Sequence, residues 1–154
     1  PYVDGNRLGI TGISYGGFMT NWAITHTDRF KAAVALNSIS NLYSKFGTSD
    51  IGFVTNRDQM GGDIWEKADE WMAKSPISYA PNVKTPLLII HSMEDYRCWL
   101  DQALQFFTAL KYLGKNVKLM LFKHGSHTFS RSGKPSSRVK RLKATLDWMN
   151  TFLK

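Results

Sequence analysis

Apolar residues along the chain follow two patterns, short unbroken runs and longer segments with helical periodicity. Unbroken or nearly unbroken runs predict strands at residues 7–11, 31–37, 86–91 and 117–122. Helical spacing predicts helices over residues 18–26, 64–74, 100–110 and 139–153, and Gly114 is expected to stop the third of these. Residues 43–62 are rich in glycine and are predicted to form a loop, and Ser136 or Ser137 is expected to cap the last helix.

Apolar strands that alternate with helices are typical of a parallel sheet covered on both faces. We therefore predict an α/β fold with about four parallel strands flanked by helices. The length of 154 residues and the hydrophobic content of 43% suit one domain over residues 1–154. No apolar run is long enough to span a membrane, so a membrane partner is not expected.

The net charge of +8 could indicate a nucleic-acid partner. Much of the excess lies in residues 130–143, where a helix with an apolar stripe is predicted. The stripe comprises Val139, Leu142, Leu146, Met149 and Leu153. Because the basic residues fall mostly on the other faces, a solvated helix surface explains the charge, and no nucleic-acid partner is expected.

The only cysteine is Cys98, so an internal disulfide is impossible. This favours a reducing compartment, and we expect a cytoplasmic protein. We expect the Cys98 side chain to be small, buried and unreactive. Histidines, cysteines and carboxylates do not have metal-ligand spacing, so neither a metal nor another cofactor is expected.

The segment "GISYGG" places Ser14 between a predicted strand and a predicted helix. It fits Gly-x-Ser-x-Gly, the pattern of a nucleophilic serine on a sharp strand-to-helix turn. A serine hydroxyl needs a base to take its proton and an acid to orient that base. The turn also aims the first N–H groups of the helix at a reacting carbonyl.

Candidate acids and bases follow two later strands. Glu94 and Asp95 come after the strand at 86–91, and His124 and His127 come after the strand at 117–122. Parallel strands deliver their carboxyl ends to one edge of a sheet, where ligands bind. The residues alone do not decide between the two carboxylates or between the two histidines.

Several segments closely resemble the C-terminal part of prolyl-oligopeptidase-family serine peptidases, especially the acylaminoacyl-peptidase-like members. They are "RLGITGISYGGFMTNW", "FGTSDIG", "KSPISYAPNVKTPLLIIHSMEDYRC" and "SHTFSRSGKPSSRVKRL". The resemblance implies an α/β-hydrolase fold with Ser14 as nucleophile, Asp95 as acid and His127 as base. It also implies that the Tyr15 N–H is an oxyanion donor. Arg97 would hold a substrate carbonyl rather than pair with a structural carboxylate.

Three positions depart from the family pattern. Trp99 and Lys123 stand where proline is expected, and Thr128 stands where an acidic residue is frequent. Trp99 is bulky, and we expect it to border the pocket that Arg97 serves. The departures therefore bear on substrate preference more than on the triad.

The resemblance covers only half of the family's catalytic domain, which has an eight-stranded sheet. We therefore expect the chain to be a piece of a longer enzyme and poorly active by itself, because the second oxyanion donor lies elsewhere. The strand at residues 7–11 would lack one neighbour. We expect that edge to pair with the missing N-terminal half or with a second copy.

Three functions fit these patterns. The first is a serine peptidase that acts on peptides or acyl-peptides. The second is a carboxylesterase on the same fold, which the triad cannot distinguish because ester and amide cleavage share it. The third is a catalytically silent α/β module that associates through its exposed edge, and labelling by a fluorophosphonate would separate it from the other two.

Overall fold

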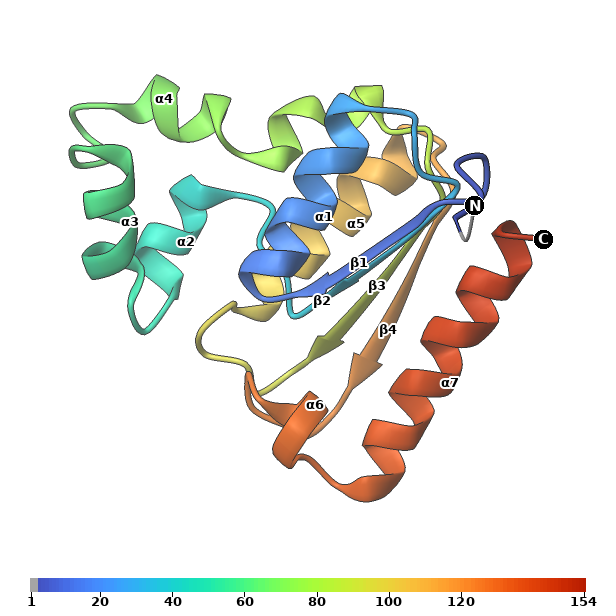
Figure 1. The fold of residues 1–154 in the computed structure, drawn as a ribbon. Helices are drawn as coiled ribbons and strands as arrows, with labels where there is room; N and C mark the ends of the chain where they lie inside the picture. Colours follow the sequence, from blue (N-terminus) through green and yellow to red (C-terminus); the bar gives the residue numbers. More distant parts are fainter. Residues whose placement is uncertain (1–2) are drawn as a thin grey trace.

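The computed structural model describes residues 3–154, except for the side chains of residues 55 and 56. Its centre is a four-stranded parallel sheet in the order β1-β2-β3-β4 (Figure 1). The strands are β1 (Gly9–Ile13), β2 (Ala32–Leu36), β3 (Leu87–Ser92) and β4 (Val117–Phe122). The predicted α/β fold with four parallel strands is confirmed.

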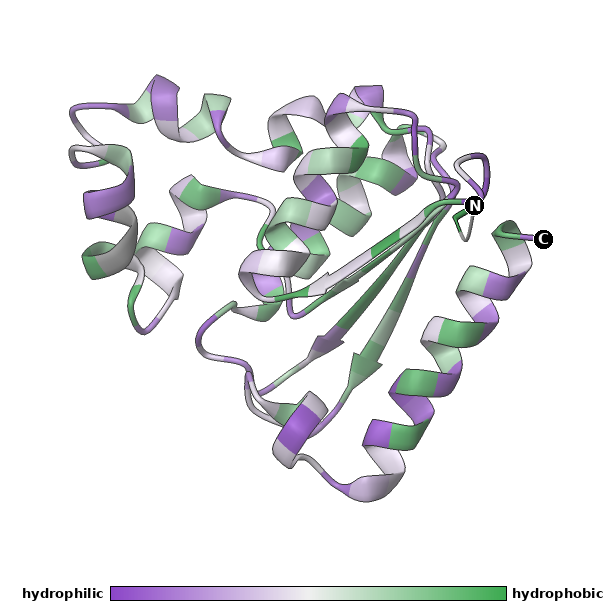
Figure 2. Cartoon of the chain, in the orientation of Figure 1, coloured by the Kyte–Doolittle hydropathy of each residue, from purple (hydrophilic) through white to green (hydrophobic). Residues whose placement is uncertain are grey.

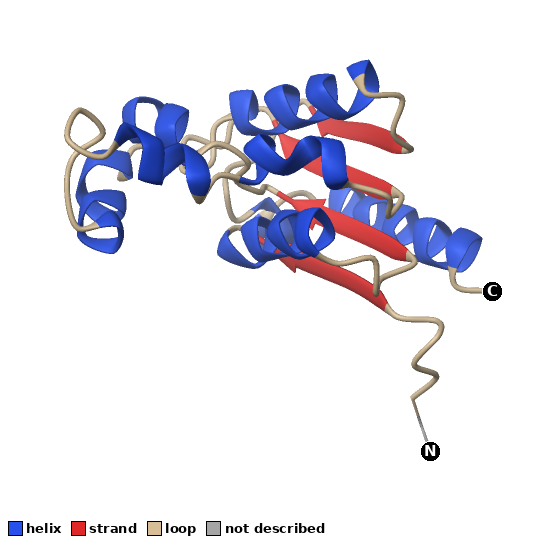
Figure 3. Cartoon of the chain, turned by 90° about the horizontal axis from the view of Figure 1, so that it is seen from above, coloured by secondary structure: helices blue, strands red, loops and turns tan. Residues whose placement is uncertain are grey.

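Helices cover both faces of this sheet. α1 (Tyr15–His26), α5 (Leu100–Tyr112) and the 3₁₀ helix η1 (Pro76–Asn82) lie on one face. α7 (Pro135–Phe152) lies on the opposite face, against β2 and β3, and the short α6 (Phe129–Ser132) precedes it (Figures 1 and 3). Gly114 follows α5 with a left-handed φ of 67°, as expected for a residue that stops a helix.

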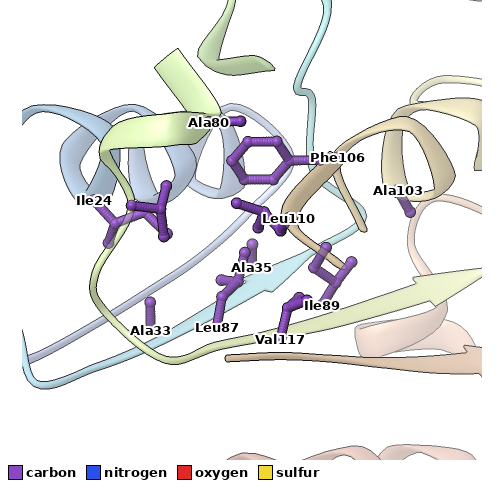
Figure 4. Close-up of a cluster of buried hydrophobic side chains, with 11 residues drawn as sticks. Ile24, Ala33, Ala35, Ala80, Leu87, Ile89, Ala103, Phe106, Leu110 and Val117 are labelled. Carbon is purple, nitrogen blue, oxygen red and sulfur yellow. The ribbon is translucent and has the colours of Figure 1, made fainter. Parts of the chain in front are cut away.

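Alternate residues of the central strands fill two separate cores. Ala33, Ala35, Leu87 and Ile89 face α1 and α5, where Phe106 and other α5 residues cover them (Figure 4). The intervening residues of β2 and β3 face α7 and its Trp148. Because β2 and β3 are buried on both faces, they read as unbroken apolar runs, and β3 is largely hydrophobic in Figure 2.

The loop predicted over residues 43–62 is wrong, because this segment is mostly helical. α2 (Leu42–Thr48) and α3 (Gly52–Met60) occupy it, and α4 (Ala68–Ala73) follows, shorter than the predicted helix at 64–74. The Asn41 side chain accepts a hydrogen bond from the Ser44 N–H and caps α2. Gly61, with φ of 68°, ends α3, so one of the glycines that suggested a loop is a helix terminator.

The expectations for α7 need two corrections. The helix begins at Pro135 after Lys134, so neither Ser136 nor Ser137 caps it. Its predicted stripe is split. Val139, Leu142 and Leu146 are 66%, 50% and 61% exposed, whereas Met149 and Leu153 pack on the core beside buried Trp148. Along residues 3–154, no helix combines the length and apolar character needed to cross a membrane.

Candidate active site

Ser14 alone forms the turn between β1 and α1. β1 runs two residues beyond its predicted end, because Ile13 still pairs in register with Leu36. Ser14 then adopts φ of 61° and ψ of −122°, and its N–H donates to the Leu36 carbonyl at 3.0 Å. Such a backbone is strained for a residue with a side chain and is typical of functional sites. The turn places Ser14 at the carboxyl edge of the sheet.

Glycines make this turn sterically feasible. A Cβ on Gly12 would overlap with the backbone of Gly16, and a Cβ on Gly17 would lie 2.6 Å from the Ser38 Cβ. The first α1 residue, Tyr15, carries an N–H that helix geometry leaves without an intrahelical acceptor. An oxyanion beside Ser14 is the natural partner for such a group.

His127 lies between Ser14 and Asp95. Its Nε2 is 2.8 Å from the Ser14 Oγ, and its Nδ1 is 2.8 Å from the Asp95 Oδ2. A carboxylate only accepts, so Nδ1–H donates to Asp95, which leaves Nε2 to accept a hydrogen bond from the Ser14 hydroxyl. The three side chains follow β1, β3 and β4, and the sheet brings them together at one edge.

Asp95 is held rigidly. Its side chain is fully buried, and its Oδ1 accepts from the N–H groups of Arg97 and Cys98, each at 2.9 Å. Its Oδ2 remains for His127. A buried carboxylate with both oxygens hydrogen-bonded can orient a histidine ring without being displaced by water.

The alternative acid and base form a separate pair on the surface. His124 Nδ1 lies 2.8 Å from Glu94 Oε1, and both side chains are about half exposed or more. The hydrogen bond from His124, followed by one from the Gly125 N–H, holds the pKa of Glu94 below its usual value. The geometry therefore brings His127, and not His124, to Ser14.

A cleft of about 630 Å³ opens beside Ser14 and His127. Most of its wall is apolar, from Phe18, Met19, Trp22, Ile39, Leu42, Ile51 and Met60. Lys45, Gln59 and Lys74 add polar groups. Lys45 is 4% exposed, and burial lowers the pKa of its ammonium. The cleft suits a mainly apolar group with polar contacts at its margins.

Arg97 lines the cleft, but it also makes an ion pair with Asp50. Its Nε and Nη2 lie 2.6 and 3.1 Å from the two Asp50 oxygens. The expectation that Arg97 does not pair with a carboxylate was wrong. The hydrogen bonds that Arg97 donates to Asp50 raise the pKa of Arg97 and lower the pKa of Asp50. The bidentate pair orients the guanidinium, whose other N–H groups can serve a ligand.

Cys98 is buried, as predicted, and it lies in the cleft wall. Burial, reinforced by the charge of Asp95, raises its pKa to about 12, so the thiol stays protonated at neutral pH. The Cys98 carbonyl accepts from His91 Nε2 at 2.8 Å, and burial lowers the pKa of His91. Neither side chain contacts the His127 ring through a hydrogen bond among those described.

The residues that depart from the family pattern lie outside the cleft. Trp99 does not line it, contrary to expectation, but packs on Tyr96 with ring centroids 5.2 Å apart. Lys123 is exposed, and Thr128 precedes α6 with its hydroxyl 2.8 Å from that of Ser132. Trp99 therefore does not narrow the cleft directly.

Four polar residues at or near the site were not singled out from the sequence. Asp50 braces Arg97, and Lys45, Gln59 and Lys74 line the cleft. All four lie in or next to the segment containing α2, α3 and α4. The only sequence signal was "FGTSDIG", which carried the resemblance without indicating a role for Asp50. Among the described side chains, no three histidines, cysteines or carboxylates gather as a metal site.

The sequence profile of the prolyl oligopeptidase family matches residues 1–154. An uncharacterized peptidase, YuxL, of Bacillus subtilis is 49% identical over 153 residues, which cover 99% of this chain and 23% of that protein. The structure of uncomplexed acylaminoacyl peptidase from Pyrococcus horikoshii is similar with a TM-score of 0.94 and 48% identity. The match covers 98% of this chain and 25% of that one.

A structure of an acylaminoacyl peptidase in complex with Z-Gly-Gly-Phe-chloromethyl ketone is equally similar, with a TM-score of 0.94 and 48% identity. It matches 98% of this chain and 24% of that one. The chain therefore spans about a quarter of the length of these relatives.

Proposed function

Because the chain belongs to the prolyl oligopeptidase family, we propose that it carries the catalytic triad of a serine hydrolase that cleaves peptide or acyl-peptide bonds. The observation that carries the proposal is the position of His127, 2.8 Å from both the Ser14 hydroxyl and the Asp95 carboxylate. These distances are those required of a nucleophile, its base and the acid that orients the base.

In the proposed reaction, the Ser14 Oγ attacks the scissile carbonyl while His127 Nε2 takes its proton. The resulting oxyanion accepts a hydrogen bond from the Tyr15 N–H. His127 then gives the proton to the leaving amine, and the carbon–nitrogen bond breaks to leave an acyl-enzyme. Water attacks this ester with His127 again as base, and Ser14 recovers its proton as the acid product departs.

Asp95 stabilises the imidazolium that forms in each half of the reaction. Its carboxylate accepts the hydrogen bond from Nδ1–H, so the ring keeps Nε2 directed at Ser14. The N–H groups of Arg97 and Cys98 support the charge of Asp95 throughout. No proton needs to move to Asp95.

We also propose that residues 1–154 are the C-terminal half of the catalytic domain, and that further residues complete the site. Two observations support this arrangement. The chain spans about a quarter of its relatives. Among residues 3–154, β1 pairs only with β2, so its other edge can accept a strand. The missing half, or a second copy of the chain, would occupy that edge. A second oxyanion donor would come from the added residues.

The proposal predicts that a fluorophosphonate labels the full-length protein at Ser14. The Ser14→Ala variant should not be labelled, because alanine has no hydroxyl to attack phosphorus. Mass spectrometry of the peptide that contains residue 14 measures the adduct directly. Absence of labelling in the unmodified protein would leave the silent association module as the better interpretation.

A carboxylesterase remains the second candidate, and the cleft favours peptides over small esters. Arg97 lines the cleft, and its N–H groups can donate hydrogen bonds to a peptide backbone carbonyl. The related acylaminoacyl peptidase in complex with Z-Gly-Gly-Phe-chloromethyl ketone is consistent with a site for peptide-like molecules. Comparison of kcat/KM for an acyl-peptide amide and a p-nitrophenyl ester separates the two functions.

Replacement of Arg97 by alanine should lower kcat/KM for a peptide substrate by about tenfold to a hundredfold. This range corresponds to the loss of one hydrogen bond to a charged group, which contributes about 1.5–3 kcal/mol. Hydrolysis of a small ester without a backbone carbonyl should change far less. Asp50→Asn keeps Arg97 but weakens the ion pair that orients its guanidinium, so an intermediate loss of kcat/KM for the peptide substrate is expected. Equal losses with both substrates would contradict the role of Arg97.

A further inference from the structure

Asn37 is a buried residue with an unusual backbone, immediately after β2. It is 0% exposed, and its φ of 39° lies in the left-handed region. Within the described part of the chain, only Ser14 shares a positive φ among residues other than glycine. Asparagine tolerates this region better than most residues with a side chain. The main chain is anchored there, because the Asn37 N–H donates to the Ile90 carbonyl at 2.9 Å.

The Asn37 side chain connects the ends of β2 and β3 to the loop between β4 and α6, residues 123–128, which contains His127 and is termed the histidine loop. Its Oδ1 accepts from the Ser92 N–H at 3.0 Å, and its Nδ2 donates to the Ser92 Oγ at 3.0 Å. Nδ2 also donates to the main-chain carbonyl of His127 at 3.2 Å. The Ser92 hydroxyl in turn donates to the Ser126 carbonyl at 3.1 Å. Hydrogen bonds from Asn37 and Ser92, at the ends of β2 and β3, therefore hold two successive carbonyls of the histidine loop, those of Ser126 and His127.

We propose that Asn37 is a positioning residue for His127, an inference that rests on the proposed hydrolase function. Asp95 orients the ring from its Nδ1 side, whereas Asn37 fixes the main chain from which the ring projects. Both constraints are needed, because a base must be placed within about half an ångström of its productive position. The carboxamide supplies an acceptor and two donors, which bond to the Ser92 N–H, the Ser92 Oγ and the His127 carbonyl.

The matched control is Asn21, a second buried asparagine. It is 1% exposed, and its Nδ2 donates to the Ser38 Oγ and the Ile39 carbonyl, in the segment that follows Asn37. Removal of either carboxamide deletes hydrogen bonds from the same part of the fold. Only Asn37 reaches the histidine loop, so only its loss should move His127.

The test compares Asn37→Gly and Asn37→Asp with Asn21→Ala in the full-length protein. Glycine keeps the left-handed backbone without the carboxamide. Aspartate keeps the shape but puts an oxygen where Nδ2 donates. Both changes at residue 37 should lower kcat and the rate of fluorophosphonate labelling by roughly tenfold to a hundredfold, the cost of a misplaced catalytic group. KM should stay nearly constant, and Asn21→Ala should retain nearly full rates.

A second measurement is independent of turnover. The Nδ1–H proton of His127 should give a low-field NMR resonance, assigned by its loss in His127→Gln. Asn37→Gly should broaden or shift it, and Asn21→Ala should not. An unchanged resonance in both Asn37 variants, or equal rate losses in Asn37→Gly and Asn21→Ala, would overturn the positioning role. Failure of the unmodified protein to react with fluorophosphonate would instead refute the proposed function, while the resonance would still report whether Asn37 holds His127.

Discussion

Replacement of His127 by alanine is expected to lower kcat/KM by about 10⁴- to 10⁶-fold, because Ser14 would lose the group that takes its proton. The His127 Nε2 is 2.8 Å from the Ser14 hydroxyl, the contact that the proposed reaction requires. The rate of fluorophosphonate labelling of the variant should fall in parallel with its turnover rate, because both depend on the same nucleophile. Steady-state kinetics with an acyl-peptide substrate measures the effect.

His124 provides the control, because the chain contains two similar histidine–carboxylate pairs. His124 Nδ1 is 2.8 Å from Glu94 Oε1, just as His127 Nδ1 is 2.8 Å from Asp95 Oδ2. The His124 pair is exposed and lies apart from Ser14, so His124→Ala should change kcat/KM by no more than about twofold, as is usual for surface changes. A large loss with His124→Ala and a small loss with His127→Ala would reverse the assignment of the base.

The largest expected effect on stability comes from Phe106→Ala, at about 3–5 kcal/mol of unfolding free energy. Phe106 is 1% exposed and lies in the core between α5 and the sheet, near Ala80, Ala35 and Leu110 (Figure 4). These neighbours belong to separate elements that cannot all move inward, so a cavity should remain. Urea unfolding followed by tryptophan fluorescence measures the loss.

Tyr112 lies on the same helix and is 90% exposed. Tyr112→Ala also removes an aromatic side chain from α5, but no cavity forms, and the free energy should change by less than about 0.5 kcal/mol. Similar losses in the two variants would mean that α5 contributes through helix propensity and not through packing of Phe106.

The buried strands were predictable because their chemistry is uniform. β3 is packed on both faces, and its apolar run ends at His91, four residues before Asp95. The elbow at Ser14 was equally predictable, because its pattern includes Gly12, where a Cβ would overlap with the Gly16 backbone. Within the site, spacing alone left two acids and two bases. Only the fold reveals that the Glu94–His124 pair faces solvent while Asp95–His127 reaches Ser14.

Other features depend on contacts between distant segments. Asp50 and Arg97 are 47 residues apart in sequence, and no local pattern indicates their pairing. Similarly, Asn37 reaches His127 across 90 residues. The helices in residues 43–62 were missed for a different reason, because glycine was interpreted only as a loop former although Gly61 terminates a helix. Long-range partners are set by topology, which composition and periodicity do not specify.

The Ser14 turn has a consequence for interpreting natural variation. Its shape depends on the backbone, through the lack of a Cβ at Gly12, which would overlap with Gly16, and through the hydrogen bond from the Ser14 N–H to the Leu36 carbonyl. Under the proposed function, a homologue altered only at the position of Ser14 is expected to keep the cleft and to bind substrate without cleaving it. Under the same proposal, a homologue with a side chain at the position of Gly12 is expected to lose the turn itself, and with it both binding and cleavage. Inactive homologues that still bind substrate can thus be distinguished from those that do not by whether the position of Ser14 or that of Gly12 has changed.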